Sequence, residues 1–294
     1  MALRRNRLTV LMGTASLLGV GVGPLLLVSP AHAAEGKGKA EVIGTAEAEF
    51  FTFSYDGGTG VRSDADVRVD ESGDESSFVY TVDDVIEIEV GSNCTHPDEA
   101  DLTKVVCTID KTETGGNDPA GVVSLNDGND ILRFTNLTNT SFTSIDLGAG
   151  ADTYTATRPN ALDAAISGGD GVDTINAGTG AYVAAGAGND LVTLIGGAAE
   201  VHGEDGNDLI NGGVGDDSLH GEAGDDVIYG NDGDDYIVGG AGNDELYGGK
   251  HNDTIYGNTG NDTIYGNSGD DYISGGAGVD TISGGAGNNT IVDV

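Results

Sequence analysis

Residues 239–247 read GGAGNDELY, and a stretch of the same kind begins again at residue 248. From residue 203 to residue 292 the chain consists of ten such nine-residue units without an insertion. Position 1 is Gly in all ten units, position 4 is Gly in nine, position 6 is Asp in nine, and position 8 is Ile or Leu in all ten. A fixed period of this kind predicts a repeat architecture in which each unit packs against its neighbours.

The recurring positions have separate physical roles. Glycine reaches positive φ at no steric cost, so positions 1–6 predict a tight turn with exposed carbonyl oxygens. The Asp at position 6 adds a carboxylate, and a flexible cage of carbonyl and carboxylate oxygens suits Ca²⁺ better than Mg²⁺. Positions 7–9 predict a three-residue strand whose position-8 side chain points inward. Two units then make one coil of 18 residues, and stacked coils bury a thin row of Ile and Leu.

The ten units resemble the repeats-in-toxin (RTX) family, also called hemolysin-type calcium-binding repeats, whose consensus is G-G-x-G-x-D-x-U-x. The resemblance covers residues 203–292 almost completely. It implies a parallel β-roll in which Ca²⁺ ions lie between successive turns on the same side, held by the position-6 Asp and by turn carbonyls. We therefore expect an all-β chain, with a C-terminal parallel β-roll preceded by a small strand-rich N-terminal segment.

The candidate calcium ligands fall into two columns, because every second turn lies on the same edge of the roll. One column contains Asp208, Asp226, Asp244, Asp262 and Asp280. The other contains Asp217, Asp235, Asp253 and Asp271, and it ends in Asn289, where the loss of charge predicts a weak site. The position-1 glycines are the candidate carbonyl ligands: Gly203, Gly212, Gly221, Gly230, Gly239, Gly248, Gly257, Gly266 and Gly275.

Weaker copies of the turn precede the regular block, and the solenoid is expected to begin near residue 120. Their aspartates extend the first column, and two are counted as candidate ligands, Asp173 and Asp190, after Asp130 and Asp152. The opposite edge has Tyr182 and Ala199 there, which predicts few metal sites. The alternative is that these aspartates are solvated turn residues, since Asp favours turns. Ordinary turns, however, need no carboxylate at every ninth position.

One unit departs from the turn pattern. His251 replaces the position-4 glycine. Histidine is among the better-tolerated residues at positive φ, so that site is expected to be weakened and not lost.

The composition favours cations as partners. The 294 residues include 51 Gly and have a formal net charge of −37, with 49 acidic and 12 basic side chains. Nucleic acids and anionic membranes need a basic surface, so neither is expected to bind. We expect a monomer.

The N-terminus has the features of a secretory signal peptide over residues 1–33. A basic segment, LRRNR, precedes an apolar stretch at residues 8–28, and AHA at residues 31–33 is a small-x-small cleavage signal. We expect cleavage near Ala33 and secretion. An uncleaved membrane anchor is the alternative, which the glycines of the stretch and Pro24 weaken.

The rest of the chain is divided by composition. We expect a loose linker at residues 34–48, a small β domain or cap at 49–118, degenerate coils at 119–202 and the regular roll at 203–294. Alternating apolar residues in the second segment predict short strands. Cys94 and Cys107 are expected to form a disulfide, as secreted chains oxidise their cysteines. A Cys-His metal site with His96 is the alternative.

These features predict a secreted protein that binds several Ca²⁺ ions and folds on binding them outside the cell. No H-E-x-x-H or G-x-S-x-G motif is present, and we expect no enzyme. A calcium-dependent adhesin or glycan-binding surface protein is the alternative, and a polysaccharide-acting enzyme is a weaker one. For the adhesin, Tyr229, Tyr247 and Tyr265 predict a ladder on one face, with Tyr236, Tyr256 and Tyr272 on the other. Tyrosine also simply favours strands.

Overall fold

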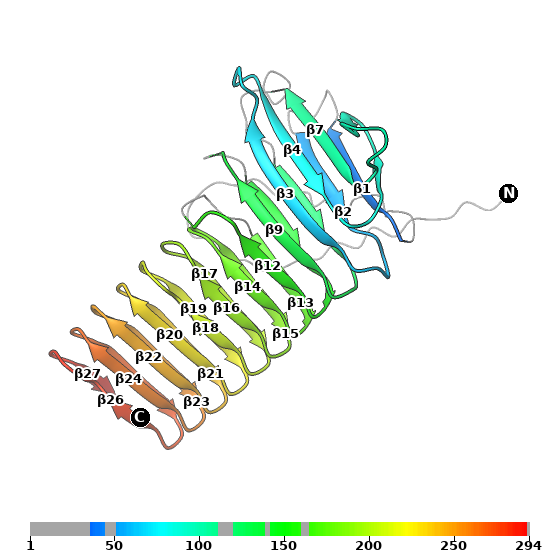
Figure 1. Cartoon of the computed structure of the whole chain (residues 1–294). Coiled ribbons are helices and arrows are strands. Elements are labelled where there is room, and N and C mark those ends of the chain that lie inside the picture. The colour runs from blue at the N-terminus through cyan, green and yellow to red at the C-terminus, as the bar shows by residue number, and fades with distance from the viewer. Residues whose placement is uncertain (1–35, 45–50, 111–119, 139–141, 160–164, 293–294) are drawn as a thin grey trace.

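The computed structural model describes residues 36–44, 51–110, 120–138, 142–159 and 165–292. The expected signal peptide, residues 1–33, lies outside the described residues. Every helix or strand element in the described part is a strand, so the expected all-β class is confirmed. The strands form a parallel solenoid of about nine coils with two walls, named sheet A and sheet B (Figure 1).

Sheet A has 14 strands. In spatial order from the C-terminal end they are β27 (Thr290–Val292), β25 (Tyr272–Ala277), β23 (Thr254–Thr259), β21 (Tyr236–Ala241), β19 (Ser218–Ala223), β17 (Glu200–Asp205), β15 (Tyr182–Ala187), β13 (Ala165–Gly171), β10 (Phe142–Asp146), β8 (Ala120–Ser124), β2 (Phe51–Asp56), β1 (Gly38–Gly44) and β5 (Ile88–Val90), with β11 (Ala149–Gly150) paired to β13.

Sheet B has 13 strands. In the same order they are β26 (Thr281–Ser283), β24 (Thr263–Ser268), β22 (Glu245–Lys250), β20 (Val227–Asp232), β18 (Leu209–Asn211), β16 (Leu191–Leu194), β14 (Thr174–Ala177), β12 (Thr153–Ala156), β9 (Ile131–Asn136), β3 (Asp64–Glu71), β4 (Ser77–Asp83), β7 (Lys104–Asp110) and β6 (Cys94–Thr95).

The chain alternates between the two walls, and each strand pairs in parallel with the strand one coil further on. In the regular block the register joins residues 18 apart, as Tyr236 with Thr254. Most strands there are six residues long and run from position 7 to position 3 of the next unit, as in Glu245–Lys250. The expected three-residue strand is too short, because the backbone of positions 2 and 3 also pairs with the next coil, as Gly240 does with Asn258.

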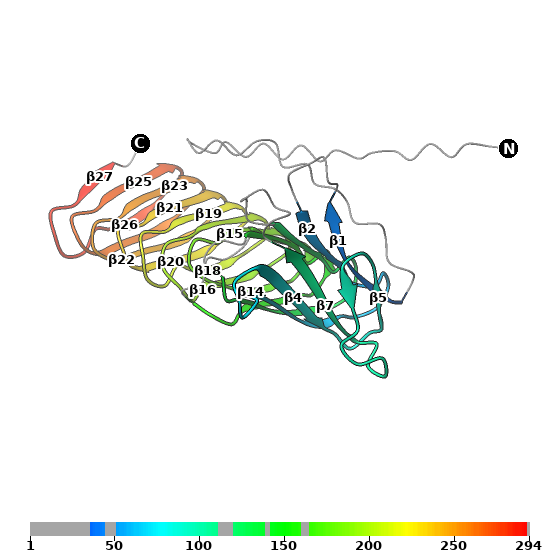
Figure 2. The ribbon, with the colours of Figure 1, turned by 90° about the horizontal axis from the view of Figure 1, so that it is seen from above.

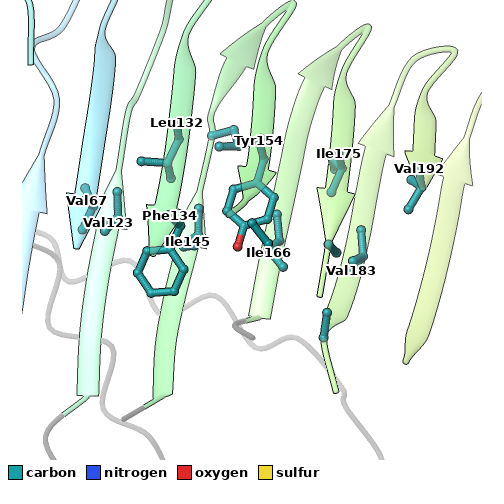
Figure 3. Packing of buried hydrophobic residues seen from close by; sticks show 14 of the residues in the cluster. Val67, Val123, Leu132, Phe134, Ile145, Tyr154, Ile166, Ile175, Val183 and Val192 are labelled. Atoms are coloured by element: carbon teal, nitrogen blue, oxygen red, sulfur yellow. The ribbon is translucent and has the colours of Figure 1, made fainter. Parts of the chain in front are cut away.

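Position 8 supplies the core of the regular block, as expected, except in the last two units, where Ile282 is half-buried and Ile291 is 48% exposed because they lie on the terminal strands of the two sheets. Its side chains are fully buried in eight consecutive units: Ile210, Leu219, Ile228, Ile237, Leu246, Ile255, Ile264 and Ile273. The earlier coils have larger inward side chains, among them Phe134 and Tyr154 (Figure 3).

Residues 51–110 continue the solenoid at its N-terminal end. Strand β2 pairs in parallel with β8, and β3 pairs in parallel with β9, so the stack begins before residue 120. Strands β4, β7 and β6 then extend sheet B in antiparallel fashion. Seen from above, the coils succeed one another from this cap to β27 (Figure 2). The cap therefore covers the backbone edge that the first coil would otherwise expose.

Two further features lie in the cap. Residues Gly38–Gly44 of the expected linker form β1, since their backbone pairs antiparallel with β2 over six residues. Cys94 and Cys107 form the predicted disulfide, with sulfurs 2.03 Å apart, so they are not free to bind a metal with His96. None of the described elements is a helix of the length and apolarity that crossing a membrane requires.

Candidate metal centre

The turn between two strands is built from residues that tolerate positive φ at two positions. Position 4 is glycine with φ between 114° and 157° in the regular block, as in Gly215 and Gly278, apart from His251. Position 2 also has positive φ, at 73° in Glu204 and 76° in Asn231, for example. Together these two positions reverse the chain within a few residues, which leaves the position-6 Asp at the start of the next strand.

Position-1 glycines are required for a different reason. No positive φ occurs among them in the regular block, so their backbone suits any residue. A Cβ on Gly203, however, would stand 2.4 Å from Asp208 Oδ2 and 2.7 Å from the carbonyl oxygen of Gly221. The same two kinds of atom surround Gly230, where the distances are 2.3 and 2.5 Å. Position 1 is therefore glycine because two oxygens converge on it. One belongs to the carboxylate of its own unit, and the other is a backbone carbonyl oxygen of the next coil.

The position-6 aspartates form a hydrogen-bonded ladder along each edge. The backbone N–H of Asp226 donates to Asp244 Oδ1 at 2.9 Å, and this bond recurs one coil further on for each pair of neighbours. The first column is continuous from Ser63, whose N–H donates to Asp130 Oδ1 at 2.6 Å. Its members are Asp130, Asp152, Asp173, Asp190, Asp208, Asp226, Asp244, Asp262 and Asp280.

The second column is shorter and contains Asp217, Asp235, Asp253 and Asp271. It begins where the N–H of Ala199 donates to Asp217 Oδ1 at 2.8 Å. In the preceding coil Ala181, and not Tyr182 as expected, occupies the corresponding place, since Tyr182 starts strand β15. Neither alanine offers a carboxylate, which agrees with the expected asymmetry between the edges.

Each aspartate of the two columns has a second oxygen without a partner. Among the described residues, Oδ2 of all thirteen is buried and accepts no hydrogen bond. Twelve of the thirteen residues are at most 3% exposed, and Asp280, near the C-terminal end, is half-buried. A buried ionised oxygen without a partner is costly, so this arrangement calls for a cation.

Burial also raises the pKa values of these carboxyl groups. Removal from water raises the pKa of Asp190, Asp217, Asp244 and Asp253 to about 7. It raises the pKa of Asp130, Asp152, Asp208 and Asp235 to about 6. The pKa values of Asp173, Asp226, Asp262 and Asp271 are raised by the same cause. A divalent cation beside Oδ2 would reverse this shift, because opposite charge favours the ionised form.

A second ladder, which the sequence analysis missed, runs along position 5. The N–H of Asn243 donates to Asp225 Oδ1 at 2.7 Å, and the N–H of Asn261 donates to Asn243 Oδ1 at 3.0 Å. The signal was present, since position 5 is Asn or Asp in nine of the ten units. These exposed side chains link the turns of neighbouring coils in a fixed register, and so help to align the buried position-6 carboxylates next to them in sequence.

Two positions interrupt the pattern near the C-terminus. Asn289 continues the ladder by accepting the N–H of Asp271 at 2.9 Å, but its Nδ2 occupies the place of Oδ2, 2.6 Å from a Cβ on Gly284. His251 adopts φ of 79°, and the inter-coil bond from Gly233 N to Lys250 O in that turn lengthens to 3.4 Å. Both departures coincide with the sites that the sequence predicts to be weak.

The chemistry of the donor set suits a hard cation. Within the described ranges, no three His, Cys, Asp or Glu side chains converge on one point, so a nitrogen- or sulfur-rich site is not formed. Each turn instead combines a carboxylate oxygen with backbone carbonyl oxygens, and all-oxygen ligation favours Ca²⁺ among common metals. The residues present therefore fit calcium held between successive coils.

Comparison with known families agrees with this geometry. A family model described as the RTX calcium-binding nonapeptide repeat (4 copies) matches residues 165–184, 195–228, 202–237, 229–264 and 256–291. No curated protein matches the chain. The matched segments contain both aspartate columns from Asp173 onward, except Asp190, which lies between two of them. The chain thus carries an array of RTX calcium-binding nonapeptide repeats, folded as a parallel β-roll.

Proposed function

We propose that the protein is secreted and binds several Ca²⁺ ions between successive turns of the roll, and that the regular block folds when calcium binds outside the cell. The observation that carries this proposal is the row of buried Oδ2 atoms without a partner on both edges. A roll that binds no cation would gain nothing from a row of buried carboxylate oxygens without a partner. A chain with a net charge of −37 also needs neutralisation to compact.

The proposed ligands follow from the geometry of the turns. Oδ2 of each position-6 Asp supplies the charge, and the carbonyls of the position-1 glycines one coil further on supply neutral oxygens. The first column extends to Asp152 and Asp130, which lie before the matched repeats but have the same buried Oδ2. Asn289 is proposed to hold no ion, because its amide nitrogen replaces that oxygen.

The size of the effect supports coupling between binding and folding. Extracellular calcium sites often have dissociation constants of about 0.1–1 mM. At a few mM calcium each site then adds about 1–2 kcal/mol to the folded state. Eight such sites add about 10 kcal/mol, which is comparable with the net stability of a whole domain. At sub-micromolar calcium the gain is close to zero, so the regular block would stay unfolded inside the cell.

Far-UV circular dichroism of the chain in EDTA, followed by titration with Ca²⁺ and separately with Mg²⁺, tests the proposal. We expect a cooperative gain of β signal with Ca²⁺ at sub-millimolar to millimolar concentration, and none with Mg²⁺. A chain that is already fully β-rich in EDTA and does not respond to Ca²⁺ would contradict the proposal.

A matched pair of variants locates the binding oxygens. Asp244→Asn keeps the ladder acceptor but replaces the buried Oδ2, and it is expected to move the calcium midpoint several-fold higher. Asp225→Asn makes the same change at exposed position 5, where Asn is common in other units, and should leave the midpoint unchanged. Equal effects of the two variants would mean that Oδ2 is not a ligand.

Secretion is tested separately. N-terminal sequencing of the protein recovered from culture medium is expected to begin at Ala34. Retention in the membrane fraction with Met1 intact would favour the anchor.

A further inference from the structure

A continuous row of aromatic rings crosses sheet A. The rings are Tyr182, His202, His220, Tyr236, Tyr256 and Tyr272, and neighbouring centroids are 4.7–5.8 Å apart. We name it the sheet A row. Tyr256 shares a face with Tyr236 and Tyr272, as the sequence predicts, and His202 and His220 continue the same row toward the N-terminus. The register pairs position 7 with position 7 and position 9 with position 9 of the next coil, as Tyr236 with Thr254 and Val238 with Tyr256. A ring at position 7 therefore meets a ring at position 9 of the next coil diagonally across the two strands.

The C-terminal half of this row has no charge. Strands β21, β23, β25 and β27 read YIVGGA, TIYGNT, YISGGA and TIV, without an acidic or basic residue. The N-terminal half differs, since His202 lies 2.7 Å from Glu222 and 3.1 Å from Glu200. On a chain of net charge −37, an uncharged wall of four strands is an unusual surface, because the carboxylates are concentrated in the turns at its two edges.

Two of the three rings of this half are exposed, and Tyr256 between them is half-buried. Tyr236 is 43% exposed and Tyr272 is 36% exposed. Successive rings are inclined by 53° between Tyr236 and Tyr256, and by 51° between Tyr256 and Tyr272, so they do not cover one another. In the described part of the chain their hydroxyls have no hydrogen-bond partner. These groups therefore combine a free apolar surface with free donors and acceptors.

The tyrosine ladder on sheet B provides the contrast. Tyr229 and Tyr247 stack with planes 8° apart, and Tyr247 and Tyr265 stack with planes 10° apart. Each inner ring face is covered by its neighbour, and the hydroxyl of Tyr247 donates to Glu245. The sheet B ladder has the geometry of cross-strand stabilisation, which leaves the sheet A row as the surface for a ligand.

We propose that the C-terminal half of the sheet A row binds a neutral β-1,4-linked polysaccharide that runs along the axis of the roll. Sugar rings stack on aromatic faces, and their hydroxyls would bond to the tyrosine hydroxyls and to Thr254 and Asn258 on β23. The row is held on a rigid sheet, so binding costs little side-chain ordering.

The charge distribution of the roll and the spacing of the tyrosines favour this class of ligand. The acidic edges repel anionic polymers such as nucleic acid or acidic polysaccharides, and the face itself offers no carboxylate to a cationic partner. Tyr236 and Tyr272 occupy the same position two strands apart, a separation of about 10 Å at the usual strand spacing. An extended β-1,4-linked chain also presents the same face at every second sugar. The match of two repeating structures favours a polymer over a single small sugar.

The test measures binding of the chain, in calcium, to cellulose and chitin particles and to their soluble hexasaccharides. The triple variant Tyr236→Ala, Tyr256→Ala, Tyr272→Ala is expected to lose about tenfold or more in affinity, as on removal of aromatic anchors. The matched control is Tyr229→Ala, Tyr247→Ala, Tyr265→Ala on sheet B, which should bind like the parent chain. Circular dichroism in calcium confirms that both variants retain the roll.

Three outcomes would overturn the proposal. The parent chain, with a folded roll, binds none of the neutral polymers. The two triple variants lose affinity equally. Sedimentation shows a dimer of the parent chain that the sheet A triple variant alone dissociates, which would make a second copy the occupant of this face. A roll that does not respond to calcium contradicts the proposed function instead, and it is seen in circular dichroism before any polysaccharide is added.

Discussion

The early coils, residues 120–194, and the regular block, residues 203–292, share one solenoid but are stabilised differently. Each early strand of sheet B buries two apolar side chains, such as Leu132 and Phe134 in β9. A strand of the regular block buries one, such as Ile228 in β20, and its second inward position is a glycine. The early coils have aspartates on one edge, whereas the regular block has them on both.

We infer from this difference that the proposed cation sites take over part of the stabilisation that the apolar core supplies in the early coils. Full burial of an additional Leu, Val or Phe side chain is worth about 1.5–3 kcal/mol. A millimolar calcium site in a few mM calcium is worth about 1–2 kcal/mol. On the proposed function, a coil that has glycine in place of an inward side chain would recover a similar amount from an ion on its second edge. The early coils and cap should be the more calcium-independent part of the molecule.

Removal of calcium is expected to produce the largest difference between the two regions. In EDTA we expect the regular block to unfold, while residues up to about 195 keep their strands, because their core is larger. Limited proteolysis followed by mass spectrometry should give a resistant fragment that ends near β16, and calcium should protect the whole chain.

The comparison fails if EDTA leaves both regions equally resistant, or if both are digested at the same rate. Hydrogen exchange of the two regions in the same sample provides the internal control.

A single methyl group at position 1 should have the next largest effect. In Gly248→Ala the new Cβ would lie 2.3 Å from Asp253 Oδ2, so the carboxylate or the backbone must move. We expect a loss of about 2 kcal/mol or more of calcium-bound stability, as for overpacking of a tight site. Thermal unfolding in calcium measures it.

Gly197→Ala is the control from the junction between the two regions. Its Cβ would meet the nearest atoms of Thr179 at 3.5 Å, which is an ordinary contact. If both alanines cost the same, the convergence of oxygens on position 1 does not explain why glycine is required there.

The sequence predicts the regular block well because one period fixes both fold and site. Position 8 pointed to the core and position 6 to the carboxylate columns, and the structure buries both in the same register. His251 was also recognised as a departure, and its turn is distorted.

The remainder could not be read from the period. The glycine at position 1 looked like a turn residue, but only the folded turn reveals that it makes room for Oδ2 of the Asp in its own unit and for a carbonyl oxygen of the next coil. Ala181 and Tyr182 could not be distinguished, since the register of an irregular coil is set by its partners. The pairing of β2 with β8 joins residues far apart in sequence, which local alternation does not encode.

Acidity should affect the two states of the regular block in opposite ways. Burial raises the pKa of Asp217, Asp244 and Asp253 to about 7 without a cation, above the ordinary value of 3.8. The folded apo state therefore binds more protons than the unfolded chain between about pH 4 and pH 7, and its stability falls as pH rises through that window. In EDTA we expect more β signal at pH 4.5 than at pH 7.5.

Calcium reverses the dependence because binding must displace those protons. The calcium midpoint should therefore rise as pH falls below about 7. Titrations at pH 5.5 and pH 7.5 measure this shift, and a midpoint independent of pH would show that the buried aspartates are not the groups that calcium occupies.

The smallest effect concerns the irregular turn within the regular block. His251→Gly removes a side chain from a residue with φ of 79° and allows the backbone conformation that position 4 has in the other units. The hydrogen bond from Gly233 N to Lys250 O is 3.4 Å long, whereas the corresponding bonds of the other units are 2.7–2.9 Å. Relief of backbone strain and a better hydrogen bond are worth about 1 kcal/mol each. Glycine loses about 0.5–1 kcal/mol of this through the entropy of the unfolded chain.

We therefore expect a net gain of about 1 kcal/mol in calcium, measured as a higher Tm and slower amide exchange at Gly233. His251→Asn is the control, because Asn also tolerates positive φ and should leave Tm nearly unchanged. A Gly variant that is less stable than the parent would mean that the His251 turn is not a defect of the block, and that the regular coils do not depend on glycine at position 4 in every unit.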